Sequence, residues 1–563
     1  MTKMKADIDI AQEAIVRPIE EVAAAMGLSR DDLELHGRYM AKVPLSVLRR
    51  MDDREDGKLV LVTAITATKA GEGKTVTSIG LMEALGHIGV KVMGALREPS
   101  MGPVFGIKGG ATGGGLAQVY PMWDIDLHFT GDIHAVTSAH NLLSAMVENH
   151  IAHRNELEID PTRVVWKKAI DMNCRELRDI VVGLGGRTVG GVPRESGFLI
   201  TAASEISAIL ALATSMDDLR SRLGRMVVAY NVRGEPVRAS QLECVGAMLV
   251  LLKDAIKPNL VQTLEGQPVF VHGFPFANIA HGSNSLLATR YALKMADVVV
   301  TEGGFASDLG AEKFFDIVCR QAGFRPDCAV IVASIRALAM HGGACLDDAV
   351  TCEGADLASL QKGFANLDKH IENIRKYGVP AVVALNRFTT DAEEEIEAVR
   401  EHCAELGVPC AVSEVYSLGG KGGRDLAETV MRVLGTQRSD FRPLYDTALS
   451  IEEKIRLIAT EIYGAKDVRY VGTAKRDIRA IELAGNNKLP ICMAKTQLSI
   501  TDDPKLKGAP RGWTLTVKEV IVAAGAGFVI PLCGDIMLIP GLPSEPSAKR
   551  IDHTDDGRIV GLS

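Results

Sequence analysis

A nine-residue stretch of the chain has the composition of a loop that binds phosphate. Residues 67–75 read Ala-Thr-Lys-Ala-Gly-Glu-Gly-Lys-Thr and follow an apolar run at residues 59–66. In a loop of this kind, backbone N–H groups and the N-terminus of the next helix hold the phosphate oxygens. Lys74 would reach the β- and γ-phosphates, and the Thr75 hydroxyl would bind Mg²⁺. We therefore predict that ATP-Mg binds at Thr68, Lys69, Ala70, Gly71, Glu72, Gly73, Lys74 and Thr75.

The loop departs from the full phosphate-binding pattern, so two other interpretations stay open. The pattern G-x4-G-K-[ST] requires glycine where this chain has Thr68. The stretch is therefore also consistent with a tight glycine turn that leaves Lys74 in solvent. Lys69 suggests a different alternative, because Lys-Ala-Gly-Glu-Gly-Lys-Thr approximates the deviant loop of dimeric ATPases, in which a second lysine reaches the partner's nucleotide. A deviant P-loop dimeric ATPase switch is thus the alternative function, since a loop motif alone does not determine function.

Arg97 is a second candidate for binding an anion. It follows the apolar run at residues 90–96. In an open α/β sheet the carboxyl ends of the strands form the ligand site, so Arg97 would lie beside the phosphate loop. Its guanidinium can form paired hydrogen bonds to a carboxylate or to a phosphoryl group in transfer. The alternative role is an ordinary ion pair, for example with Glu98.

Both positions follow runs of apolar residues that have the character of strands. Between the two runs lies a stretch with a helical period that starts at Thr75. The two runs and this stretch together predict a βαβ unit. Further strands are predicted at residues 180–184, 226–230, 269–272, 297–301, 329–334, 381–386 and 409–413. We expect an α/β fold, P-loop NTPase-like, with a mostly parallel sheet, helices on both faces and smaller additional domains.

The chain is long enough for several domains. At about 150 residues per domain, 563 residues suggest three or four units. We expect residues 1–130 and 250–365 to form a nucleotide and acyl-phosphate domain, with residues 131–249 as an inserted α/β domain. Residues 366–563 would form a C-terminal domain that contributes to a second substrate site.

Composition limits the class of partner and the compartment. Lys and Arg number 63 against 71 Asp and Glu, a net charge of −8, so broad binding to nucleic acid or to an anionic membrane is not expected. The ten cysteines form no CxxC pair, which indicates reduced thiols. The sequence has neither the start of a secretory signal nor an apolar run of the ~18 residues that span a bilayer. We expect a soluble, cytoplasmic protein.

Several longer motifs resemble one enzyme family, that of formate–tetrahydrofolate ligase. The first begins at Arg97 as Arg-Glu-Pro-Ser, and the second is Asp-Leu-His-Phe-Thr-Gly-Asp-Ile-His at residues 126–134. Others are Pro-Phe-Ala-Asn-Ile-Ala-His-Gly at residues 275–282 and Asp-Leu-Gly-Ala-Glu-Lys-Phe-Phe-Asp at residues 308–316. The resemblance extends over nearly the whole chain.

The resemblance implies a reaction of ATP, formate and tetrahydrofolate that yields 10-formyltetrahydrofolate, ADP and phosphate through formyl phosphate. Phosphoryl transfer depends on positioning and charge neutralisation, which Lys74, Mg²⁺ at Thr75, and Arg97 would supply. The resemblance also implies a homotetramer and activation by a monovalent cation, K⁺ or NH₄⁺. As alternatives, the chain could be a dimeric switch or a catalytically silent folate-binding relative. Its length leaves no room for a second enzyme domain.

The resemblance carries further site residues. Arg97 would hold formate and then formyl phosphate, Asp132 would orient the metal or accept the N10 proton, and His134 would shuttle that proton. The alternative for both is helix capping, since Thr-Gly-Asp precedes a helical run.

Aromatic residues would bind the pterin ring. The candidates are Phe305, Phe388 and Tyr416, of which the last stands where the family commonly has Trp. Core packing is the alternative for each of these aromatic residues.

Overall fold

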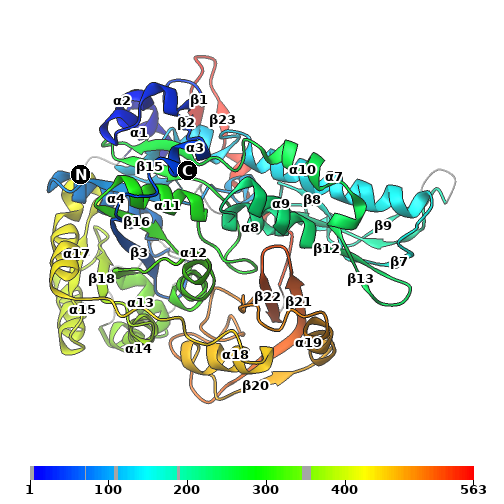
Figure 1. Cartoon of the computed structure of the whole chain (residues 1–563). Helices are drawn as coiled ribbons and strands as arrows, with labels where there is room; N and C mark the ends of the chain where they lie inside the picture. The colour runs from blue at the N-terminus through cyan, green and yellow to red at the C-terminus, as the bar shows by residue number, and fades with distance from the viewer. Residues whose placement is uncertain are drawn as a thin grey trace.

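A twelve-stranded sheet forms the centre of the molecule. The computed structural model describes residues 5–69, 71–106, 112–186, 191–344, 357–534 and 536–562. Seven neighbouring strands of the sheet are parallel. In spatial order they are β15 (Pro268–Val271), β4 (Val92–Leu96), β16 (Val298–Glu302), β3 (Lys58–Ala64), β17 (Cys328–Ala333), β18 (Ala381–Asn386) and β19 (Cys410–Ser413). Figure 1 shows this sheet within its helices.

Helices cover both faces of the sheet because successive strand residues point to opposite sides. Val60 and Val62 of β3 belong to a core that includes α4 (Lys74–His87) and α17 (Arg424–Thr436). Leu59 and Leu61 belong to a second core with α11 (Leu286–Met295) and α14 (Leu357–Lys376). The interiors of these strands are buried and mostly apolar, as expected for a parallel sheet between two helical layers. The α/β class and the mostly parallel sheet are therefore confirmed.

An antiparallel extension continues the sheet beyond β15. Strand β14 (Asn259–Thr263) pairs antiparallel with β15, with β2 (Ala41–Lys42) and with β6 (Ala117–Tyr120). At the edge, β1 (Glu34–Leu35) pairs with β2, and β5 (Gly113–Gly114) pairs with β6. Sequence analysis predicted none of these strands, because most are too short to show a period.

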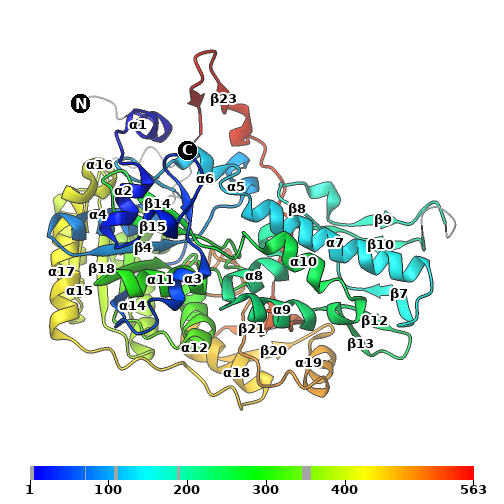
Figure 2. The ribbon, with the colours of Figure 1, turned by 45° about the horizontal axis from the view of Figure 1, so that its top comes forward.

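The segment between β6 and β14 forms an arm that projects from the sheet (Figure 2). Its helices are α7 (Asp132–Ala152), α8 (Glu205–Leu212), α9 (Met216–Arg225) and α10 (Val245–Leu252). Its strands, over the residues that the structure describes, form three small sheets. In the first, β7 (Ile159–Val164) and β13 (Pro236–Arg238) flank β12 (Val227–Asn231). In the other two, β9 (Ile180–Val182) pairs with β10 (Arg194–Ser196), and β8 (Lys168–Ile170) pairs with β11 (Phe198–Ile200).

Two predicted strands therefore lie outside the main sheet. The runs predicted at residues 180–184 and 226–230 do form strands, namely β9 and β12, but both pair antiparallel within the arm. The middle residue of β9 is exposed, and no residue of that strand is fully buried. A strand with that exposure cannot occupy the centre of a sheet that is covered on both faces.

The main sheet continues past residue 366, where the C-terminal domain was expected to start. Strands β18 and β19 come later in the chain, and β18 pairs with β17 over five residues. A separate lobe follows, with β20 (Asp467–Tyr470), β21 (Thr514–Ala523) and β22 (Phe528–Cys533) in one sheet beside α18 (Ile451–Leu457) and α19 (Ala474–Leu483). A division at 366 would thus separate two strands from their own sheet.

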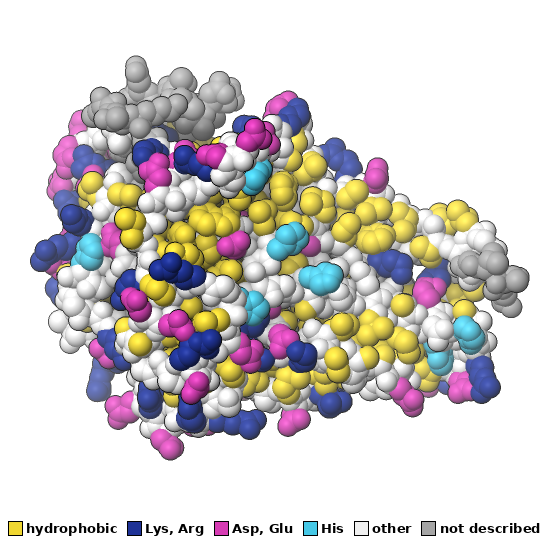
Figure 3. Space-filling model, turned by 90° about the horizontal axis from the view of Figure 1, so that it is seen from above, with side chains coloured by type: hydrophobic (Ala, Val, Ile, Leu, Met, Phe, Trp, Pro, Cys, Tyr) yellow, Lys and Arg dark blue, Asp and Glu magenta, His cyan; other side chains and the backbone are white. Residues whose placement is uncertain are grey.

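Charges of both signs are distributed over the surface. On the face seen in Figure 3, acidic and basic side chains alternate among apolar ones. Among the helices that the structure describes, none is both long and apolar enough to cross a membrane.

A buried ion pair joins the extended sheet to the arm. Lys42 Nζ of β2 lies 2.8 Å from Asp132 Oδ1 at the start of α7, and both side chains are almost fully buried. Asn259 donates to Asp132 Oδ2 at 2.8 Å and accepts from Lys42 at 2.8 Å. Every charge in this cluster therefore has a partner, as a buried ion pair requires.

We expect Lys42→Met to destabilise the protein by about 3–5 kcal/mol, because it leaves the Asp132 carboxylate buried without a counter-charge. The matched control is Lys58→Met, which breaks an ion pair with Asp327 in which the lysine side chain is 58% exposed. That change should cost at most about 1 kcal/mol. Thermal unfolding followed by circular dichroism tests the difference, and equal shifts in Tm for the two variants would contradict it.

Candidate active site

The predicted phosphate loop connects β3 to α4, and its conformation depends on two glycines. Gly71 and Gly73 have φ values of +75° and +77°, a region that other residues rarely adopt. Gly73 is the N-cap of α4, which begins at Lys74. A Cβ atom at Gly73 would lie 2.1 Å from Nδ2 of Asn386, at the end of β18. The same Nδ2 donates to the Glu72 carbonyl at 3.2 Å, so Asn386 holds the loop from a neighbouring strand.

The side chain of Glu72 bonds back to the first half of the same loop. Glu72 Oε1 accepts from the Thr68 backbone N–H at 2.6 Å and from the Thr68 hydroxyl at 3.0 Å. Thr68 thus occupies the position of the missing glycine with its polar groups satisfied. Lys69 is exposed, whereas Ala70 lies outside the described residues.

The predicted anion-binding residues surround one buried carboxylate, that of Glu302. Glu302 Oε2, at the end of β16, lies 2.6 Å from Lys74 Nζ and accepts from the Thr75 hydroxyl at 3.0 Å. Arg97 Nε lies 3.9 Å from the other oxygen, Oε1. The structure therefore brings Lys74, Thr75 and Arg97 together.

The cations keep Glu302 ionised. Burial by itself would raise the pKa of Glu302, but the charges of Lys74 and Arg97, with hydrogen bonds from Lys74 and Thr75, hold it below its usual value. Arg97 Nε is buried and has no hydrogen-bond partner among the described residues. The guanidinium thus retains capacity to bind an anion.

Glu98 is not the ion-pair partner of Arg97. Burial, with the charge of Asp132 nearby, raises the pKa of Glu98 well above its usual value, which disfavours the charged form of this side chain. The carboxylate that faces Arg97 is Glu302. Arg97 therefore has an ion-pair partner, but that partner is neither Glu98 nor a helix carboxylate, because Glu302 ends a strand.

Phe305 follows Glu302 in a strained turn beside Arg97. Its φ is +61°, in the left-handed region that disfavours large side chains. The preceding residue is Gly304, and the turn passes close to Arg97 there. A Cβ atom at Gly304 would lie 3.2 Å from Arg97 Nη1. An observed backbone outlier beside an anion-binding side chain is typical of a functional site.

The other two aromatic candidates follow the adjacent strands β18 and β19. Phe388 is half-buried, and the Arg336 guanidinium lies 4.7 Å from the centre of its ring. The Tyr416 side chain is 43% exposed, and its hydroxyl donates to Asp7 at 3.1 Å. Burial and the nearby Asp7 raise the pKa of Tyr416 to about 12, so its hydroxyl remains protonated at neutral pH.

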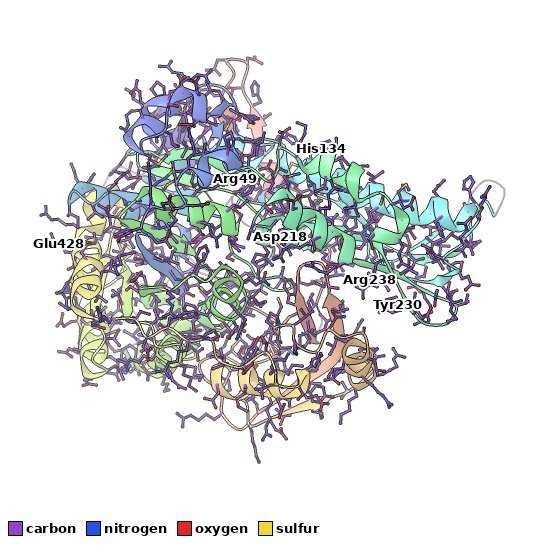
Figure 4. The ribbon with its side chains drawn as sticks, viewed as in Figure 1. Arg49, His134, Asp218, Tyr230, Arg238 and Glu428 are labelled. Carbon is purple, nitrogen blue, oxygen red and sulfur yellow. The ribbon has the colours of Figure 1, made fainter. Side chains whose placement is uncertain are left out.

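Asp132 and His134 both lie in the first turn of α7. The Asp132 carboxylate belongs to the buried cluster with Lys42 and Asn259. His134 is exposed, near its label on the upper side of the arm in Figure 4, and its ring lies 3.5 Å from the Ser138 hydroxyl. The N-cap of this helix is Gly131, without a side-chain hydrogen bond, so neither residue has the predicted capping role.

Two residues that sequence analysis did not select organise the loop. Glu302 ends an apolar strand, and Asn386 ends another, so each is a polar residue at the carboxyl end of a buried strand. That position is a signal for a ligand site in this type of sheet. Which loop each would face depends on the strand order, and the sequence does not contain that order in any local pattern.

The oxygen atoms at Thr75 and Glu302 suit a magnesium ion. Mg²⁺ is usually held by one or two carboxylates together with the phosphates of the substrate. The Thr75 hydroxyl and the Glu302 carboxylate lie 3.0 Å apart at the start of α4. In the part of the chain that the structure describes, no group of three or more His, Cys, Asp or Glu side chains could hold a metal without such a substrate.

A comparison with protein families adds an independent finding. The model of the formate–tetrahydrofolate ligase family matches residues 5–563. The match covers the loop, the sheet, the arm and the C-terminal lobe together.

We expect Glu302→Gln to raise the Mg²⁺ concentration needed for turnover by at least about tenfold, because the amide keeps the shape but loses the charge. The measurement is the rate of ATP-dependent turnover as a function of Mg²⁺. Glu393→Gln, on an exposed part of α15 (Glu393–Glu405), serves as the control and should leave the Mg²⁺ dependence unchanged. A Glu302→Gln enzyme with the same Mg²⁺ dependence would remove this carboxylate from the metal site.

Proposed function

The chain belongs to the formate–tetrahydrofolate ligase family, and from this premise we propose how its residues carry out the reaction. The family implies formate, ATP and tetrahydrofolate as substrates. We propose that the product is 10-formyltetrahydrofolate, formed through formyl phosphate with release of ADP and phosphate. The observation that supports this mechanism is the convergence of Lys74, Thr75 and Arg97 on Glu302.

The first step moves the γ-phosphoryl group of ATP to formate. A formate oxygen forms a bond to the γ-phosphorus while the bond to the bridging oxygen of ADP breaks. Such a transfer has a loose transition state that depends on alignment and charge neutralisation. Lys74 Nζ, now 2.6 Å from Glu302, would move to the γ-phosphate, and Arg97 would hold the formate carboxylate. Mg²⁺ bound at Thr75 and Glu302 would supply further neutralisation of the phosphate charge.

In the second step, N10 of tetrahydrofolate attacks the formyl carbon. The C–O bond to phosphate then breaks, phosphate leaves with the bonding electrons, and N10 loses its proton. Arg97 would stabilise the negative charge on the departing phosphate. The proposed roles of Asp132 and His134 in taking the proton stay predictions, and the buried pairing of Asp132 with Lys42 favours a positioning role for that carboxylate.

We propose that the pterin ring binds among Phe305, Phe388 and Tyr416. These residues follow β16, β18 and β19, whose carboxyl ends lie at the same edge of the sheet as the phosphate loop. Flat aromatic ligands bind well against aromatic faces. That arrangement would place tetrahydrofolate next to the anion held by Arg97.

Other expectations from the family resemblance stay predictions. They are the P-loop fold, the homotetramer, activation by K⁺ or NH₄⁺, and a cytoplasmic location. The family match gives no support to the dimeric ATPase switch, because the family that matches residues 5–563 is a ligase family.

The decisive experiment measures 10-formyltetrahydrofolate as its methenyl form after acid treatment, with each substrate and K⁺ omitted in turn. We expect product only when ATP, formate and tetrahydrofolate are all present. Lys74→Ala should lower turnover by at least about a hundredfold, because one preorganised cation at the transferred group is lost.

Lys69→Ala is the comparison for Lys74→Ala, since Lys69 is an exposed lysine of the same loop that lies outside the Glu302 cluster. This variant should lose less turnover than Lys74→Ala. ATP hydrolysis that needs no formate and that Lys69→Ala abolishes would favour the switch over the ligase.

A larger ring at residue 416 should bind the pterin more tightly. We expect Tyr416→Trp to lower the Kd for tetrahydrofolate by about two- to tenfold, the range of an added aromatic contact. Tyr416→Phe removes only the hydroxyl that contacts Asp7 and should leave the Kd near the wild-type value. Titration calorimetry gives both constants, and no change in the Trp variant would exclude Tyr416 from the ring site.

A further inference from the structure

A cavity of about 710 Å³ opens between the arm and the C-terminal lobe. Its walls come from α9, from the short helix η4 (Ala239–Leu242), from the start of α10, and from Asn486 just after α19. The volume lies within the range of small-molecule sites, about 300–1,000 Å³. None of its lining residues belongs to the Glu302 site.

Three guanidinium groups line this cavity. They belong to Arg220, Arg225 and Arg238, and within the described residues no carboxylate lies within ion-pair distance of them. Arg222, on the same helix as two of them, is by contrast paired with Asp218 at 2.9 Å. Figure 4 labels Asp218 and Arg238 on the lower side of the arm.

Two of the three arginines are held in place by neighbouring polar groups. Arg238 Nη1 donates to the Arg225 carbonyl at 3.2 Å, and Arg225 Nη1 donates to the Ser221 hydroxyl at 2.8 Å. Burial, with the positive charges of Arg222 and Arg238, lowers the pKa of Arg225, although the carboxylates of Asp218 and Glu205 act in the opposite direction. One acid, Glu243, also lines the cavity. The lining therefore has an excess of positive charge that a bound anion would neutralise.

The N-terminus of α10 adds a second feature that favours anions. Val245 and Gly246, the first residues of this helix, line the cavity. The N-cap residue Cys244 makes no side-chain hydrogen bond to the helix. The first N–H groups of a helix have no partner within it and carry partial positive charge. A Cβ atom at Gly246 would meet nothing within 4 Å, so the backbone there is open to a ligand.

We propose that this cavity binds a small polyanion with at least two phosphate or carboxylate groups. One group would bind between Arg220 and Arg225, and another between Arg238 and the N–H groups of α10. The hydroxyls of Ser221 and Ser240 and the amide of Asn486 would donate further hydrogen bonds. Guanidinium groups suit both kinds of anion, because they form paired hydrogen bonds with phosphate and with carboxylate.

The ligand would bind where the arm meets the C-terminal lobe. Arg225 Nε and Nη2 lie 3.4 Å from the carbonyls of Ala524 and Gly525, at the tip of the β21–β22 hairpin. Arg222 donates to the next carbonyl, that of Ala526, at 3.0 Å. The cavity is therefore lined almost entirely by the arm, with Asn486 as the contribution of the C-terminal lobe, and it does not depend on the proposed reaction.

The test is titration calorimetry of the full chain at about 0.15 M salt, where weak surface attraction is largely screened. Pyrophosphate is the phosphate probe and citrate is the carboxylate probe. Both are titrated into a Lys74→Ala background, which weakens binding of either probe at the phosphate loop. We expect one of them to bind, and the preferred probe identifies the class of anion.

Two variants locate the binding site. Arg220→Gln and Arg238→Gln, each in the same background, should weaken the bound probe about 10- to 100-fold, as expected for the loss of a charge-assisted hydrogen bond. Among the residues that the structure describes, Arg220 forms no hydrogen bond or ion pair that its replacement would disturb, so we expect that variant to keep the folded structure. The control is Arg154→Gln, which removes the same charge from a side chain that is 86% exposed beyond the end of α7.

The proposal is overturned if neither probe binds, or if both variants bind the probe as tightly as the Arg154→Gln control does. A second copy of the chain could occupy the cavity instead of an anion. Sedimentation velocity tests this, because it measures the oligomeric state. A change of oligomeric state in Arg220→Gln, without binding of either probe, would show that the cavity is an interface and would also overturn the proposal.

Discussion

The Glu302 carboxylate is the interaction on which the arrangement of the site depends. A fully buried carboxylate is stable in its ionised form only where cations and donors surround it. Here the cations come from two other segments, Lys74 after β3 and Arg97 after β4. Strand β16 lies between β4 and β3 in the sheet, so its last residue stands between the two loops. The strand order therefore fixes the charge cluster, and a phosphate that enters would replace Glu302 as the partner of Lys74.

Neutral polar groups hold the other side of the loop in place. Burial lowers the pKa of His370 to about 4, so its ring is uncharged at neutral pH and can both donate and accept. It bridges the Thr66 hydroxyl at 3.0 Å and the Ser307 hydroxyl at 2.7 Å. Asn366, one turn earlier on α14, donates to Thr66 and to the Gly508 carbonyl of the C-terminal lobe. The start of the loop is thus tied to the segment after Glu302 and to the lobe.

Residues that belong to a local sequence pattern could be predicted, whereas contacts between distant segments could not. Lys74 and Thr75 were predicted from the glycine-rich motif that follows an apolar run, and Arg97 because it directly follows another such run. Glu302 was missed, since its importance comes from the position of β16 between two strands that precede it by some 200 residues. The partner of Asp132 is Lys42, 90 residues earlier, in a two-residue strand without any period. The short strands of the arm were assigned to the wrong sheet for a related reason, because a strand-like run does not specify its partner.

The turn after Glu302 connects the charged half of the site to the aromatic half. Gly304 donates to the Gly282 carbonyl at 2.8 Å, and a Cβ atom there would lie 2.4 Å from that of Ala277. The turn is therefore too tightly packed for any other residue, and it delivers Phe305 in a left-handed conformation that costs roughly 1–2 kcal/mol. That cost is tolerated only where the surroundings determine the backbone. The same few residues thus set the distance from the Glu302 carboxylate and Arg97 to the first aromatic ring. If the ring binds the pterin, the backbone of this turn positions the attacking nitrogen relative to the anion on Arg97.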